Sequence, residues 1–113
     1  MNFVRHDDVP EMILKNGTKA NLRSWNDQFT IIHAVRPTGV LFPVDQHPEI
    51  QIYIIVKGKI ELTVGDETHI LTDGDTWIVD SNIPHIANVI EETEEYEVFY
   101  PARQDLVERY LNQ

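Results

Sequence analysis

The chain has 113 residues and a mass of 13.1 kDa, a length at which we expect one hydrophobic core and a single domain over residues 1–113. Nine Lys and Arg residues against nineteen Asp and Glu residues give a formal net charge of −10. This charge repels phosphate groups, so nucleic-acid binding and docking on an anionic membrane are disfavoured, and a small-molecule ligand is favoured.

The sequence contains no cysteine, which excludes disulfides, thiolate nucleophiles and cysteine-ligated metal centres. A metal ion would therefore be held by His, Asp, Glu or Gln, and the five histidines are the first candidates. The first residues lack the apolar core of a signal peptide, and no stretch is apolar over the length that crosses a membrane. These features predict a cytoplasmic protein.

Several short segments carry apolar residues at every second position, which predicts strands. In chain order they are residues 28–36, 50–56, 59–64, 76–79, 86–90 and 95–100. Pairs such as Lys57-Gly58 and Asp73-Gly74 are typical of the turns between strands. The acidic run 91–95 is predicted to be a solvated loop.

This spacing of strands and turns is typical of an antiparallel sandwich or barrel rather than of βαβ units. Helix is expected only at the ends of the chain. Residues 7–10 predict a short N-terminal turn, and residues 103–111 predict a short amphipathic helix at the C-terminus. The fold class is therefore all-β with a C-terminal helix.

Candidate metal ligands gather in residues 39–58. Asp45, His47 and Gln51 are separated by even numbers of residues, so in an extended segment their side chains share one face. Pro48 interrupts this segment, which indicates that the strand begins after it and that Asp45 and His47 approach from the preceding loop.

A second histidine at the start of a distant strand would complete this set. His85 follows Pro84 and a turn that contains Ser81 and Asn82. With it, four side chains offer imidazole nitrogens and hard oxygens, which suit Zn, Fe(II), Mn or Ni. One divalent ion from this group is the predicted cofactor.

The two segments resemble the paired motifs of the cupin superfamily, over approximately residues 28–100. The first motif is matched at Gly39, Asp45, His47, Gln51 and Gly58, and the second at Gly74, Pro84 and His85. The resemblance implies a single-domain jelly-roll β-barrel or sandwich with one metal ion held by Asp45, His47, Gln51 and His85. It also implies a homodimer, for which Tyr96, Val98, Tyr100 and the apolar side of the terminal helix are candidate interface residues.

The sequence departs from this pattern at three positions. Asp45 stands where the family usually has its first histidine, and Asp80 and Asn82 replace a proline and a glycine of the second motif. Asn tolerates the left-handed backbone that Gly supplies. A carboxylate is a competent ligand that favours harder cations; the alternative is that Asp45 points to solvent and the site is metal-free.

The end of the chain resembles small cupins related to the pectin-degradation proteins, which convert unsaturated uronates into their open-chain keto form. Those proteins carry an acid, a Phe two residues later and an Arg four residues after the Phe, which are matched by Glu97, Phe99 and Arg103. The resemblance implies that Arg103 and Phe99 bind the substrate and that Glu97 moves a proton. A strand-end acid and an Arg that fixes the helix are the structural alternative.

Four other residues complete the candidate list. Tyr53 shares the face of Gln51, and its hydroxyl is a second candidate for the catalytic acid. His33 is predicted to be a structural histidine in a strand, and His6 and His69 are predicted to lie at the surface.

These residues favour an enzyme that carries out a metal-assisted isomerase- or lyase-type proton transfer on a small carboxylated sugar or related organic acid. Two alternatives stay open at this point: an iron-dependent dioxygenase, and a protein that binds a small ligand without converting it.

Overall fold

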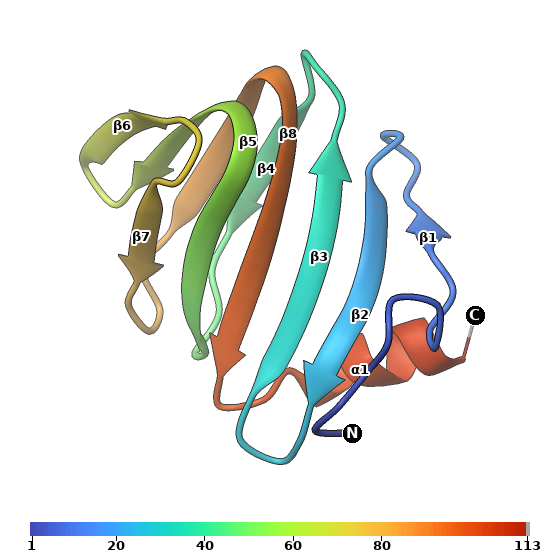
Figure 1. Cartoon of the computed structure of the whole chain (residues 1–113). Coiled ribbons are helices and arrows are strands. Elements are labelled where there is room, and N and C mark those ends of the chain that lie inside the picture. Colours follow the sequence, from blue (N-terminus) through green and yellow to red (C-terminus); the bar gives the residue numbers. More distant parts are fainter. Residues whose placement is uncertain (113) are drawn as a thin grey trace.

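Eight strands and one helix form the fold of residues 1–112, which the computed structural model describes (Figure 1). They are β1 (Met12–Ile13), β2 (Lys19–Trp25), β3 (Thr30–Arg36), β4 (Leu41–Asp45), β5 (Ile50–Val64), β6 (Glu67–Leu71), β7 (Thr76–Val79), β8 (His85–Tyr100) and α1 (Gln104–Leu111). Neighbouring strands pair antiparallel throughout these residues. The prediction of an all-β fold with a C-terminal helix is therefore confirmed.

The strands form two layers that share β5 and β8. In the larger layer, the order is β1-β2-β3-β8-β5-β7, with the second half of β8 beside the first half of β5. In the smaller layer, the first half of β8 lies between β4 and the second half of β5, which also pairs with β6. Figure 1 shows β5 and β8 curving from one layer into the other.

The predicted breaks inside β5 and β8 are wrong. Lys57-Gly58 is not a turn, and the acidic run 91–95 is not a loop, because both lie within continuous strands. The pairing of β5 with β8 instead shifts register between Ile55 and Ile60, and such bulges bend a strand without ending it. The sequence features that predict turns here mark the bend between the two layers.

Gly58 occupies the tightest point of this bend. Its φ is 127°, and a Cβ added there would lie 2.6 Å from the Cα of Thr93 on β8. The Oγ1 of Thr93 also accepts a hydrogen bond from the backbone N–H of Lys59 at 3.1 Å. Only glycine allows the two backbones to approach this closely.

Gly58→Ala is therefore expected to lower the free energy of unfolding by about 2–3 kcal/mol through backbone strain and displacement of β8. Gly39→Ala is the matched control, because Gly39 also has a positive φ, of 83°, but has no atom within 4 Å of an added Cβ. That substitution is expected to cost about 1 kcal/mol. Urea unfolding of both variants measures the difference, and equal losses would contradict the close approach at Gly58.

Four strands, β1, β2, β4 and β6, were not predicted; β1 has only two residues, and the other three have polar or interrupted sequences. β2 contains Asn21 and Arg23 among its apolar residues, and β6 is exposed over most of its length. β4 contains Pro43, which lacks an N–H, but β4 pairs within residues 1–112 only with β8 and lies at a sheet edge, where proline is tolerated.

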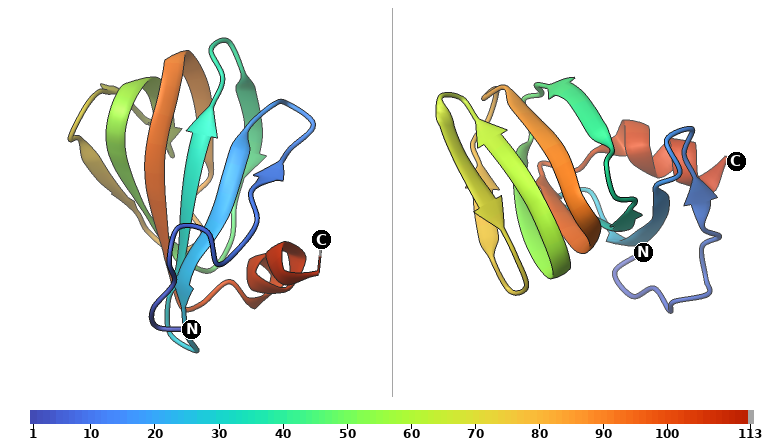
Figure 2. Two further views of the ribbon diagram at one scale, coloured as in Figure 1. Left: turned by 45° about the vertical axis from the view of Figure 1, so that its right-hand side comes forward. Right: turned by 90° about the horizontal axis from the view of Figure 1, so that it is seen from above.

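Two separate apolar clusters form the core. One joins β2, β3 and α1 and includes Leu22, Ile32 and Val107; the other lies between the layers and includes Ile60, Leu62 and Val89. The helix lies beside β2, close to the N-terminal segment (Figure 2). α1 confirms the predicted terminal helix, and no helix among the described residues is long and apolar enough to cross a membrane.

Candidate metal centre

Four predicted ligands come together at one end of the space between the layers. Asp45 ends β4 and lies opposite His85 on β8, so it belongs to a strand and not to the loop that the sequence suggested. His47 lies in the loop after β4, and Gln51 lies on β5. Ligand atoms of Asp45, His47 and His85 all lie within 4.8 Å of one another, so this group is a candidate metal site.

When both imidazoles are neutral, the donor atoms face one another without a hydrogen between them. The Nδ1 atoms of His47 and His85 lie 2.9 and 3.0 Å from the backbone carbonyls of Glu49 and Ile83, so each Nδ1 carries the proton. The Nε2 atoms therefore present lone pairs, and they lie 3.0 and 3.2 Å from Oε1 of Gln51. A set of acceptors that converges in this way is stabilised by a bound cation or an added proton.

The spacing of these atoms fits a divalent metal ion. Ligand atoms about 2.1 Å from a metal are about 3.0 Å apart in octahedral geometry and about 3.4 Å apart in tetrahedral geometry. Oδ2 of Asp45 lies 3.7 Å from Nε2 of His47 and 4.0 Å from Nε2 of His85. The Asp45 side chain is 61% exposed, which leaves a solvent-facing side for a ligand or water.

Two loops fix the position of His47. The backbone N–H of Asn82 donates to the carbonyl of His47 at 2.9 Å, and the Gln46 amide donates to the carbonyl of Asn82 at 2.8 Å. Asn82 has a φ of 63°, so it adopts the left-handed conformation predicted for this position. These contacts hold the loop that carries His47 against the start of β8.

A buried polar chain extends from Gln51 into the interior. The Gln51 amide nitrogen donates to Oε1 of Glu97, and the guanidinium of Arg36 donates from Nη2 to Oε2 of Glu97 and from Nε to Oε1 of Glu95, both at 2.7 Å. Because Glu97 accepts from the amide nitrogen, the Gln51 oxygen is turned toward the histidines. Glu97 and Arg36 thus orient the side chain of Gln51, a candidate metal ligand.

Burial and charge shift the pKa values within this chain. Burial raises the pKa of Glu95 to about 8, although the adjacent Arg36 opposes the shift, so Glu95 is protonated at neutral pH. For Arg36, burial alone would lower the pKa, but the carboxylates of Glu95 and Glu97 outweigh it and the pKa is raised. Arg36 is therefore held as a buried cation between Glu95 and Glu97.

The pH dependence of stability should report the buried proton on Glu95. Between pH 4.5, the ordinary pKa of a Glu side chain, and about pH 8, the folded protein keeps this proton and the unfolded chain releases it. The free energy of unfolding therefore falls as the pH rises over this range and levels off above it. Glu95→Gln cannot titrate, so its stability is expected to exceed that of wild type increasingly toward pH 8, by a few kcal/mol.

Urea unfolding of wild type and Glu95→Gln at several pH values measures this difference. Glu92→Gln, at an exposed position in the same acidic run, serves as the control and should follow the wild-type curve. Parallel curves for wild type and Glu95→Gln between pH 5 and 8 would contradict the prediction.

The three remaining predicted residues lie close to the metal donors. The Phe99 ring packs 5.8 Å from the His47 ring, and Cζ of Arg103 lies 5.2 Å from the centre of the Phe99 ring. Arg103 forms two hydrogen bonds with Asp105, at 3.0 and 2.9 Å. The hydroxyl of Tyr53 makes no hydrogen bond within residues 1–112, and burial raises its pKa well above the usual value, so it remains a proton donor.

One cavity of about 410 Å³ between the larger layer, β4 and α1 is bordered by Tyr53, Phe99 and Arg103, and also by Asp45, Gln51 and His85. This volume lies in the range of small-molecule sites. His33, in contrast, lies on the outer face, where Nε2 is 2.8 Å from Glu94, and His6 and His69 are exposed, as predicted.

Arg36 was not among the predicted site residues, although its position in the sequence indicates that it is buried. It continues the inward face of β3, after Ile32 and Ala34, where a charged residue requires a buried partner. Glu95 and Glu97 supply that partner from the inward face of β8.

The sequence of residues 32–99 matches the cupin domain family (Cupin_2). This match spans more than half of the chain, so the protein belongs to the cupin domain family. None of the curated proteins compared with this chain matches its sequence.

Solved structures share the fold at low sequence identity. An RmlC-like cupin from Shewanella frigidimarina superposes with a TM-score of 0.87 at 22% identity, covering 94% of this chain and 96% of that one. KdgF from Halomonas sp. gives a TM-score of 0.85 at 20% identity, covering 92% and 96%. A variant of oxalate decarboxylase from Bacillus subtilis gives 0.72 at 21% identity, and the match covers 83% of this chain but 28% of the decarboxylase.

Proposed function

We propose that the protein is a metal-dependent enzyme that moves a proton within a small carboxylated sugar or related organic acid. The observation that carries this proposal is the convergence of four acceptor side chains, Asp45, His47, Gln51 and His85. All of them except His47 border the cavity. The structural similarity to KdgF and the matching Glu97, Phe99 and Arg103 support a uronate-like substrate.

The residues around the donor set have distinct proposed roles. A divalent metal, when bound, would polarise a carbonyl or ring oxygen of the substrate. Arg103 would hold a substrate carboxylate against the ring of Phe99. The Tyr53 hydroxyl would donate a proton and the Glu97 carboxylate would accept one, since both lie on the inner face and border the cavity.

Loss of the ultraviolet absorbance of an unsaturated uronate tests this function directly. We expect faster loss with the metal-loaded protein, and a large drop in rate after chelation or in Tyr53→Phe, which keeps the ring and removes the proton donor. Recovery of the unchanged substrate together with a thermal shift on binding would indicate a binding protein instead. Oxygen consumption that requires Fe(II) and substrate would indicate a dioxygenase.

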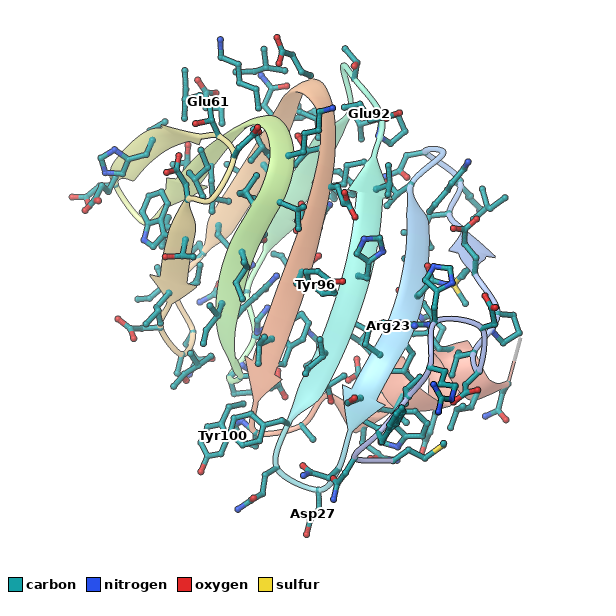
Figure 3. All side chains as sticks on the ribbon, in the orientation of Figure 1. Arg23, Asp27, Glu61, Glu92, Tyr96 and Tyr100 are labelled. Carbon is teal, nitrogen blue, oxygen red and sulfur yellow. The ribbon has the colours of Figure 1, made fainter. Side chains whose placement is uncertain are left out.

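We also propose that two copies of the chain associate through the outer face of the larger layer. Rows of apolar side chains cross this face, and in one row Ile78, Ile52, Val98 and Ile31 are successive partners on β7, β5, β8 and β3. Tyr96 and Tyr100 lie on the same face (Figure 3) and are 38% and 47% exposed. An apolar face of this width is typical of a protein–protein contact.

Sedimentation equilibrium tests the dimer. Wild type is expected to have about twice the 13.1 kDa mass of one chain, and Ile54→Glu, at the centre of the outer face, is expected to be a monomer. Leu41→Glu on β4, which lies behind this layer in Figure 1, is a control that should remain dimeric. A wild-type mass near 13.1 kDa would indicate a monomer and would contradict the proposed dimer.

A further inference from the structure

The cavity that borders the candidate metal donors is also lined by residues of β2, β3 and α1. We call this side of the cavity the arm; it is bordered by Thr18, Ala20, Ala34, Arg36, Arg109 and Tyr110. Ala20 and Ala34 are direct partners on β2 and β3, and the next pair, Lys19 and Val35, places Thr18 opposite Arg36. Two adjacent alanines leave space that larger side chains would fill.

Several hydrogen-bond donors in the arm have no partner among residues 1–112. The Thr18 hydroxyl is buried and makes no hydrogen bond. Arg36 uses Nε and Nη2 for the two glutamates, which leaves Nη1 without a hydrogen bond to the described residues. Arg109 forms neither a hydrogen bond nor an ion pair within this part of the chain, although it borders the same cavity. A buried donor without a partner is uncommon in folded proteins, so the Thr18 hydroxyl calls for a ligand or water. Arg109 is exposed, so its guanidinium is free to pair with an anion that enters the cavity.

The charge of the arm favours an anion. Three of the five arginines of this acidic chain border the cavity. Within residues 1–112, the carboxylates that border it are Asp45, at the donor end, and Glu97, which is paired with Arg36 at 2.7 Å. Arg103 is paired with Asp105, and Arg109 is thus the cavity arginine without a carboxylate partner among residues 1–112.

Two neighbouring groups, Glu95 and Tyr110, add no negative charge near the arm at neutral pH. Glu95 does not compensate Arg109, because burial raises its pKa to about 8 and keeps it protonated. Burial likewise raises the pKa of Tyr110 to about 12, so its hydroxyl is a neutral donor.

We infer that the arm binds an anionic group, a carboxylate or a phosphate, at the end of the substrate remote from the metal donors. The inference rests on the proposed function, because both use the same cavity, and it narrows the substrate class. With Arg103 near the donor end, the cavity would select a small acid with an anionic group at each end over one with a single carboxylate.

Three open-chain six-carbon acids test this selection. Gluconate has one carboxylate, glucarate has a second carboxylate at the other end, and 6-phosphogluconate has a phosphate there. Calorimetric titration of the metal-loaded protein is expected to show about tenfold tighter binding of glucarate or 6-phosphogluconate than of gluconate. The tighter of the two identifies the anion that the arm takes.

Two conservative variants assign the effect to the arm. Thr18→Val keeps the shape of the side chain, and Arg109→Gln changes an exposed residue, so both are expected to fold. Each should weaken binding of the tighter acid by about tenfold and leave gluconate binding unchanged. Arg5→Gln, which removes an arginine outside the cavity, should alter neither.

Equal binding of all three acids by wild type would overturn the inference. A variant that weakens gluconate binding as much as it weakens binding of the doubly anionic acid would also overturn the inference. The substitution would then have distorted the whole cavity. Metal content and melting temperature are measured on each protein. They distinguish failure of this inference from failure of the proposed function. A wild type that takes up no metal would contradict that function, yet it should still prefer the doubly anionic acid, because the arm contains no metal donor.

Discussion

His47→Ala and His85→Ala are each expected to lower metal affinity by more than 100-fold, since changes behind a metal ligand alone cost about 10–100-fold. Each substitution removes one of two imidazole nitrogens that face Gln51 at 3.0 and 3.2 Å. Mass spectrometry of untagged protein is expected to find close to one divalent ion per wild-type chain and almost none in either variant. Turnover of the substrate should fall with the metal content.

Two other histidines provide matched controls for this experiment. His33→Ala and His69→Ala remove imidazoles on the outer face and at the surface, so both variants should keep their metal. Asp45→Asn separates the two interpretations of Asp45. If the carboxylate is a metal ligand, the variant is expected to bind the metal more weakly than wild type does. A wild-type protein that stays metal-free after supplementation with Zn, Mn, Ni and Fe(II) would contradict the metal centre.

Arg36→Met is expected to lower the free energy of unfolding by about 3–5 kcal/mol, because it leaves the Glu97 carboxylate buried without its cation and the protonated Glu95 without its hydrogen-bond donor. The guanidinium side chain is 10% exposed and contacts both carboxylates at 2.7 Å, and its Cζ lies 4.0 Å from the centre of the Phe42 ring. For a domain of this size the melting temperature should fall by roughly 10–20 °C. Calorimetry measures this loss.

The origin of that loss is tested by removing the carboxylates as well. The triple variant Arg36→Met, Glu95→Gln, Glu97→Gln is expected to recover most of the stability, since no charge is then buried without a partner. Arg5→Met removes an exposed arginine and should change the melting temperature little. A triple variant as unstable as Arg36→Met alone would show that packing, and not charge, explains the effect.

Local sequence patterns predict the elements whose structure depends on local interactions. β7 has the predicted bounds, residues 76–79, and α1 differs from its prediction by one residue, because alternation and amphipathic spacing are short-range features. The continuity of β5 and β8 depends on pairing between distant residues. Lys57-Gly58 is typical of a turn by itself, and it lies within a strand because β8 pairs on both sides of it.

The same distinction applies to the candidate site. His47, Gln51 and His85 could be predicted to converge because motif spacing encodes their positions, and the structure brings them together. Arg36 could not be assigned from spacing, because its partners lie about sixty residues away on β8. Glu95 was missed for a similar reason. It belongs to the acidic run 91–95, whose charges predict a solvated segment, but alternate residues of that run face inward.

The two apolar clusters share β8, which supplies Val89 to one and Phe99 to the other. Neither cluster can lose its packing without disturbing a strand that the other needs. The domain is therefore expected to unfold in a single cooperative transition despite its divided core. Pairing of β3 and β8 across some sixty residues of chain also raises the entropy cost of reaching the native topology, so folding is expected to be slow for a chain of this length.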